Sequence, residues 1–158
     1  MHTRDAILYV LNSARYVTSA YLGDLSDQDI LVRPAPKAHH IAWQLGHLLL
    51  AEAMMANAVQ VGTGITFPAG FEVGHSSEGD GPYLTKAEYV DLRNAQRERT
   101  LIVIKEISDH ELSLPGPEKM RAYAPTKGTV LLAIGTHEMM HSGQMAVVRR
   151  LLEKPVVV

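Results

Sequence analysis

The sequence predicts an all-α protein, a four-helix bundle with a long crossover connection between its second and third helices. Four segments of roughly 20 to 28 residues carry helical periodicity, and no strand pattern is longer than the closing V-V-V. One connecting segment is much too long for a tight turn. The 158 residues can bury a core of their own, so a single domain over 1–158 is the simplest organisation.

The composition excludes several classes of function. Hydrophobic residues make up 46%, charged residues 20%, and the net charge is −2, which leaves no basic footprint for nucleic acid. No run approaches the roughly 18 apolar residues of a membrane span, and the N-terminus lacks the apolar core of a signal peptide. We therefore expect a cytoplasmic protein that binds neither nucleic acid nor membranes. Without cysteine, a metal site has to use His, Asp or Glu.

The first two helices are predicted from periodicity and composition. The first covers 3–22, where apolar residues recur at i, i+3, i+4 and i+7, and Gly23 supplies a C-terminal stop. The second covers 39–61, whose Ala, Leu and Met residues favour helix, and Gly62 ends it. Residues 62–84 hold six glycines and two prolines. We expect this long segment to cross one end of the molecule and to cover the mouth of a pocket.

The last two helices carry clearer boundary signals. Thr85 and Glu88 form a capping-box pattern that begins a helix over 85–108. Its middle, R-N-A-Q-R-E-R, is polar and predicts a narrow buried stripe. The fourth helix covers 126–154, and Pro155 stops it.

The segment T-H-E-M-M-H-S-G-Q in the fourth helix carries two histidines, His137 and His141. A helix turns about 400° in four residues, so both imidazoles project from one face, one turn apart. That spacing lets two ring nitrogens chelate one metal ion. A lone inward histidine is more often a hydrogen-bonded core residue. Two in register on an apolar face are costly to bury unpaired, which favours a metal site.

His47 lies in the second helix, in the segment I-A-W-Q-L-G-H-L. Taken alone it would be interpreted as a core histidine. Because the two histidines of the fourth helix leave a metal ion short of ligands, His47 is the predicted third ligand. Three neutral imidazoles leave one coordination position free, so the metal ion can take part in chemistry. Gly46 beside it is interpreted as a point of close helix packing.

Four further residues are weaker candidates. Gln144 is placed to hydrogen-bond a ligand ring or a bound water. Glu138 either belongs to the site or faces solvent. His40 is on the same face as the third ligand, roughly 10 Å away, and either lines a pocket entrance or lies on the surface at the helix start. Trp43 is expected in the core, with a possible second role as pocket wall.

At these motifs the chain resembles the DinB-like (YfiT-like) superfamily of metal proteins. The resemblance rests on I-A-W-Q-L-G-H-L-L at 41–49 and T-H-E-M-M-H-S-G-Q-M at 136–145, and R-P-A-P-K at 33–37 also fits the approach to the second helix. It extends over nearly the whole chain in length and helix order. A four-helix bundle with a crossover is what this family implies.

The resemblance also implies one divalent metal ion, zinc, nickel or iron, held by one histidine of helix two and two of helix four. These positions fall on His47, His137 and His141. Members with known activity are mostly transferases or isomerases that use a low-molecular-weight thiol such as bacillithiol or mycothiol. Homodimers are common among them.

Three functions remain open at this stage. The leading one is a metal-dependent thiol S-transferase that activates an external thiol toward a small-molecule substrate. The second is a small-molecule hydrolase, because H-E-M-M-H matches the H-E-x-x-H pattern in which Glu is the general base. A protease is not favoured, since Glu153 is the sole carboxylate after His141. The third is a non-catalytic metal- or ligand-binding stress protein.

Overall fold

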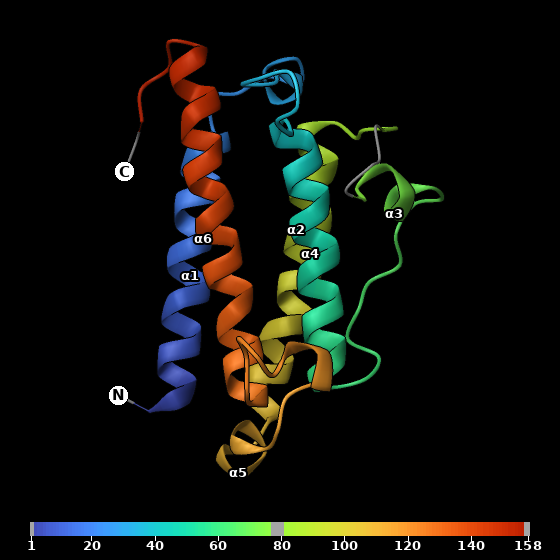
Figure 1. Cartoon of the computed structure of the whole chain (residues 1–158), viewed down its shortest axis with the longest axis vertical. Helices are drawn as coiled ribbons and strands as arrows, with labels where there is room; N and C mark the ends of the chain where they lie inside the picture. Colours follow the sequence, from blue (N-terminus) through green and yellow to red (C-terminus); the bar gives the residue numbers. More distant parts are fainter. Residues whose placement is uncertain (1, 77–80, 157–158) are drawn as a thin grey trace.

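The computed structural model describes residues 2–76 and 81–156. Its four long helices, drawn in Figure 1, are α1 (Thr3–Leu22), α2 (Ile41–Val59), α4 (Lys86–Glu106) and α6 (Lys127–Leu151). The connections hold the short helices α3 (Phe71–Gly74) and α5 (Asp109–Ser113) and the 3-10 turns η1 (Asp29–Leu31) and η2 (Glu118–Met120). No strand occurs within the described ranges, so the all-α prediction is confirmed. In the same ranges, no helix combines the length and the apolar character that a membrane crossing requires.

The connection between α2 and α4 returns along the length of the bundle. In Figure 1, α2 runs downward, the connector climbs beside it through α3, and α4 runs downward again. Helices α2 and α4 are therefore parallel, while α1 and α6 run the opposite way, so the predicted crossover is confirmed. The expectation that 62–84 crosses one end of the molecule is wrong for its described part. Two parallel helices joined in sequence oblige the chain to travel back a full helix length.

Side-chain caps define where the long helices begin. The Thr85 hydroxyl accepts a hydrogen bond from the backbone of Glu88 at 3.3 Å, and the Glu88 carboxylate accepts one from the backbone of Thr85 at 2.8 Å. Thr126 caps α6 in the same way. Helix α2 begins at Ile41, two residues later than predicted, because His40 is its cap. A capping side chain satisfies a backbone N–H that has no partner inside the helix.

The end of α6 is held by Arg149, which is fully buried. Its guanidinium donates to the carbonyl oxygen of Tyr21 at 2.7 Å and to the carboxylate of Asp24. Its Nε donates to the carbonyl oxygen of Pro155 at 2.8 Å. These bonds draw the following residues back against the bundle, so α6 ends at Leu151, before the predicted position 154.

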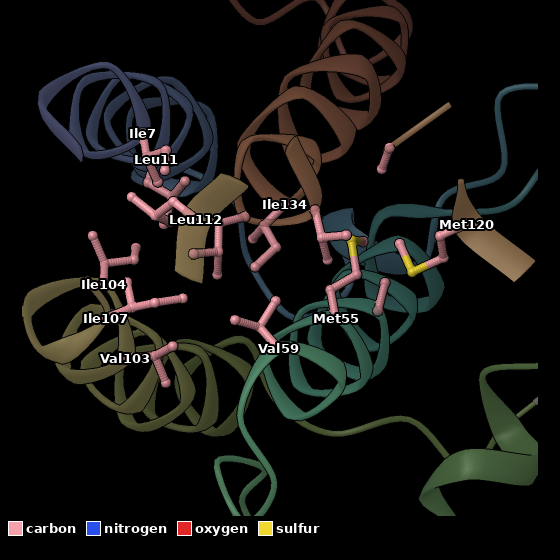
Figure 2. Packing of buried hydrophobic residues seen from close by; sticks show 14 residues of the cluster. Ile7, Leu11, Met55, Val59, Val103, Ile104, Ile107, Leu112, Met120 and Ile134 are labelled. Atoms are coloured by element: carbon pink, nitrogen blue, oxygen red, sulfur yellow. The ribbon is translucent and has the colours of Figure 1, made fainter. Parts of the chain in front are cut away.

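The core consists of two apolar clusters. Figure 2 shows the first, where side chains of the four long helices meet those of α5 and η2: Ile7, Leu11, Met55, Val59, Val103, Ile104, Leu112, Met120 and Ile134. The second lies toward the other ends of the same helices: Leu22, Leu45, Leu49, Tyr89, Met145 and Val148. Burial of these side chains supplies most of the stabilising free energy.

A polar layer of charged side chains separates the two clusters. Arg97 of α4 donates from Nε and Nη2 to the carboxylate of Glu52 in α2 at 2.8 and 3.0 Å. It also donates to Glu138 of α6 at 2.7 Å and to the carbonyl oxygen of Leu11 in α1 at 3.0 Å. Arg93 makes a further ion pair with Glu138. One buried network therefore links all four long helices, and each of its charges has a partner.

Candidate metal centre

Helices α2 and α6 bring three imidazoles together. His47 comes from α2, whereas His137 and His141 come from successive turns of α6. The Nε2 atoms of His47 and His137 are 3.3 Å apart, and one ring nitrogen of each of the three residues lies within 4.8 Å of the others. His141 is buried and the other two rings are half-buried. The three predicted ligands thus form one cluster at the seam between the two helices.

The donor set and its spacing fit one divalent metal ion. Zinc binds imidazole nitrogens at about 2.0–2.1 Å, which places two ligands of a tetrahedral site roughly 3.3–3.4 Å apart. The 3.3 Å between His47 and His137 has this value, and all the separations are within 4.8 Å. The Nδ1 atom of His141 is buried and has no hydrogen-bond partner among the described residues. Such an atom is costly unless a ligand satisfies it.

Burial lowers the pKa of all three histidines. Removal from water is the largest cause for His47 and for His137. Burial, together with repulsion from His137 and His47 when these are charged, lowers the pKa of His141 to about 4. The three rings are therefore neutral at pH 7, and a neutral imidazole has the lone pair that a metal ion needs.

The metal-free protein is expected to lose stability as the pH falls from 6.5 toward about 4. The folded-state pKa of each ring is below the ordinary value of 6.5, so in this window the unfolded chain binds more protons. Stability then rises with pH, is fully present above 6.5, and is lost on acidification. Urea denaturation of the metal-free protein across this range measures the slope. His141→Gln should flatten it, and an unchanged slope in that variant would contradict the assignment.

An aromatic stack holds the His47 ring. Trp43, one turn earlier in α2, lies parallel to it with ring centroids 4.8 Å apart, and His39 stacks on the other face of the indole at 3.5 Å. The indole N–H donates to the carbonyl oxygen of Ser76 at 2.9 Å, which ties the stack to the connector. Trp43 is buried, as expected of a core residue. His40 is not on the surface: it is buried, and its Nδ1 accepts the α2 cap hydrogen bond from the Trp43 backbone at 3.0 Å.

Gln144 lies at the rim of the cluster. Its side chain is exposed, and its hydrogen bond with His141 raises the pKa of that ring, against the stronger effect of burial. It also lines a shallow pocket of about 340 Å³ together with His39 and Gln44. The Gln144 side chain is thus beside the candidate ligand His141, where the hydrogen bond predicted for it is made.

Glu138 is in the bundle interior and belongs to the polar layer. It is 2% exposed, so the expectation that it faces solvent is wrong. Burial by itself would raise its pKa, but the positive charges of Arg93 and Arg97 and the hydrogen bond from Arg97 lower it. The carboxylate is therefore ionised and already shared between two arginines. The H-E-x-x-H mechanism needs this group as a free general base at the metal ion, a role for which it is poorly placed.

A pocket of about 520 Å³ opens beside His47. One wall comes from the following turns of α2 and the other from the connector, so 62–84 contributes a pocket wall, and the expectation that it covers a pocket mouth stays a prediction. Most of the lining is apolar and includes Leu50, Ala53, Met54, Ile65 and Phe67. Besides His47, the polar side chains in its wall are Asn57 and Glu72. A molecule in this pocket would be next to one candidate metal ligand.

His75 anchors the connector on α2, directly beside the metal centre. Its ring lies against Gly46, where an added Cβ would be 2.0 Å from the imidazole. Nδ1 donates to the carbonyl oxygen of Phe71 at 2.7 Å, so Nε2 accepts a hydrogen bond from the Tyr89 hydroxyl at 2.6 Å. Burial raises the pKa of Tyr89 to about 12, which keeps that donor protonated. The close approach predicted at Gly46 is therefore made by an imidazole and not by a helix.

Gly46→Ala is expected to destabilise the protein by about 1–3 kcal/mol and to loosen the connector, because the new methyl group overlaps the hydrogen-bonded His75 ring. Gly143→Ala is the matched control: no atom lies within 4 Å of its Cβ position, and alanine favours helix by up to about 1 kcal/mol. Thermal denaturation and limited proteolysis of the connector compare the two variants. Equal melting temperatures would show that the ring can move aside without cost.

Sequence reasoning missed the polar layer that packs next to this centre. Two signals were present. Arg93 and Arg97 are spaced i, i+4 on one face of α4, and Glu52 is the only charged residue of α2. The layer also contains the Thr18 and Ser142 hydroxyls, which are 2.9 Å apart. Which arginine meets which carboxylate depends on helices that are distant in the sequence.

The sequence matches a known protein family. A sequence model of the DinB superfamily matches residues 11–145, the greater part of the chain, and the match includes His47, His137 and His141. None of the curated proteins matches the chain.

Proposed function

Because this chain belongs to the DinB superfamily, we propose that it is a metal-dependent S-transferase that joins an external low-molecular-weight thiol to a small electrophilic substrate. His47, His137 and His141 hold one divalent ion: zinc, nickel or iron. The observation that carries the proposal is the cluster of three neutral imidazoles beside an apolar pocket. A cluster with this donor set leaves a position open for a further ligand.

A divalent cation held by neutral ligands lowers the pKa of a thiol that binds to it. The 158 residues contain no cysteine, so the sulfur comes from a co-substrate. In the transfer, the thiol gives up its proton and its sulfur forms a bond to an electrophilic carbon. The electron pair of the bond that breaks leaves with the departing group, which takes up a proton. The chain keeps its three rings neutral by burial and holds His47 against Trp43.

The electrophile is placed in the pocket beside His47. Its apolar walls favour a substrate with an apolar body. Phe67 of the connector stacks on Phe71 at 5.1 Å, which stiffens the outer wall. His75 holds the connector against Gly46 of α2 and Tyr89 of α4. The shape of the substrate pocket therefore depends on these contacts of His75.

The test is spectroscopic. Cobalt replaces the native metal, and the protein is titrated with bacillithiol, mycothiol and glutathione. Direct coordination should produce a sulfur-to-metal charge-transfer band in the wild type and none in His141→Ala. If no thiol changes the cobalt spectrum even at millimolar concentration, the transferase proposal is wrong. Turnover of ester or amide substrates without a thiol would then favour a hydrolase, and its absence a non-catalytic metal-binding protein.

We also propose that the protein forms a homodimer through α1 and α6. Tyr9 and Tyr16, two turns apart on α1, are 69% and 67% exposed, and Met140 and Val147 of α6 are 57% and 51% exposed. Both helices therefore expose apolar side chains at positions two turns apart, which a second copy could cover. Tyr16→Lys should shift sedimentation toward monomer, whereas Tyr123→Lys, at an equally exposed position outside these helices, should not. A monomeric wild type would contradict the proposal.

A further inference from the structure

A second pocket, of about 250 Å³, lies in the seam between α1 and α4. Helix α1 packs chiefly against α6 and only lightly against α4, so this seam is the loosest edge of the bundle. The pocket shares no lining residue with the pocket beside His47. Its walls are the second half of α1 and the first half of α4, and buried residues of the polar layer close its inner end.

The walls of this pocket are strongly cationic. They carry Arg15, Lys86, Arg93 and Arg97 against one carboxylate, Glu52. Even when Glu138, the second carboxylate of the polar layer, is counted, four positive charges stand against two negative ones, which leaves a net charge of +2. Charges lining a partly enclosed pocket are screened less than charges on an open surface.

Two of these cations are already held by other groups. The guanidinium of Arg97 is held by the two carboxylates of the polar layer. The ammonium of Lys86 donates to the carbonyl oxygens of Leu22, Gly23 and Leu25, and so caps the C-terminal end of α1. A cation at that end is also stabilised by the helix dipole. All three N–H groups of Lys86 and four of the five of Arg97 are used in these bonds, so neither group is a main donor for a ligand.

The other two arginines, Arg15 of α1 and Arg93 of α4, have donors to offer. Nη2 of Arg15 donates to the Asn94 side chain at 2.8 Å, and Nη2 of Arg93 pairs with Glu138. The remaining N–H groups of both make no hydrogen bond to the described residues. The Arg93 side chain is only 13% exposed. No nitrogen of either arginine is among the buried atoms that lack a partner in the described residues, so these N–H groups are accessible to a ligand that enters the pocket.

We propose that this pocket binds a small anion whose carboxylate or phosphate group lies between Arg15 and Arg93. A guanidinium is planar and offers paired N–H donors that match the oxygens of either group. The volume is below the roughly 300–1,000 Å³ of pockets for drug-sized ligands, so the anion is small. Leu22 and Val90 supply an apolar side for its carbon part. The proposal uses none of the three histidines and stands apart from the transferase proposal.

The experiment is a titration of the full chain, at constant ionic strength kept with chloride, with inorganic phosphate and separately with succinate. Binding is followed by NMR through the side-chain N–H signals of arginine. Saturable shifts are expected at Arg15 and Arg93, and competition between the probes would show that they share the site. Arg15→Gln should weaken binding about tenfold or more, because a charge-assisted bidentate contact is lost. Arg15→Lys keeps the charge and should recover only part of the affinity.

Arg150→Gln is the matched control, since it removes one positive charge from an exposed position of α6. If shifts are linear and equal in Arg15→Gln and Arg150→Gln, the anions act only by screening, and the proposal is wrong. Circular dichroism and thermal melting establish that the Arg15 variants are folded. His47→Ala should bind the anion as the wild type does. Loss of binding in that variant would place the anion at the metal centre and also overturn the proposal.

Discussion

Arg97→Met is expected to lower the free energy of unfolding by about 3–5 kcal/mol, a large part of the stability of a domain of this size. Methionine fills similar space but leaves the carboxylates of Glu52 and Glu138 in the core without their shared counter-charge. The hydrogen bond to the Leu11 carbonyl oxygen is lost as well. Because Arg97 bridges all four long helices, the loss is global and not confined to one edge of the bundle.

Urea denaturation of wild type and variant measures this effect. Arg150→Met makes the same chemical change at an exposed position and should alter stability by no more than about 0.5 kcal/mol. Adding Glu52→Gln to Arg97→Met should restore part of the loss, since the carboxylate that has lost its only ion-pair partner is then removed, whereas Glu138 keeps Arg93. A loss below about 1 kcal/mol for Arg97→Met would mean that water reaches the carboxylates and that the layer is not dry.

Each of the variants His47→Ala, His137→Ala and His141→Ala is expected to remove most of the bound metal. Two imidazoles remain in each case, and affinity should fall by more than the roughly 10- to 100-fold typical of changes outside the direct ligands. Metal analysis of the purified proteins, followed by competition with a chromophoric chelator, measures the loss. His110→Ala is the control, since His110 is exposed and outside the cluster. Full occupancy in all three variants would place the metal elsewhere.

The helices were predictable because their signals are local. The second and fourth were expected over 39–61 and 126–154 and are found at Ile41–Val59 and Lys127–Leu151. The capping box at Thr85 works within one turn, so four residues are enough to recognise it. The differences in extent come from contacts outside each helix, such as the buried Arg149 that holds the residues after α6.

The path of the connector was not predictable in the same way. Its glycines and prolines exclude a long helix but do not say along which side of the bundle the chain returns. His75 decides this by fitting against Gly46 and bonding to Tyr89, a residue of another helix. A histidine in an irregular segment carries no pattern, so its role appears only when its partners are in place.

The sequence by itself determined the all-α class, the order of the helices and the pairing of His137 with His141, because helix geometry puts residues four apart on one face. His47, 90 positions before His137, was predicted as the third ligand, but only the tertiary structure decided that it reaches the cluster and that Glu138 turns to Arg93 and Arg97 instead of to the metal centre. The physical reason is one of range. Periodicity and capping act within one or two turns, whereas buried charges and shared ligands are matched between helices whose register is set by packing of the whole core.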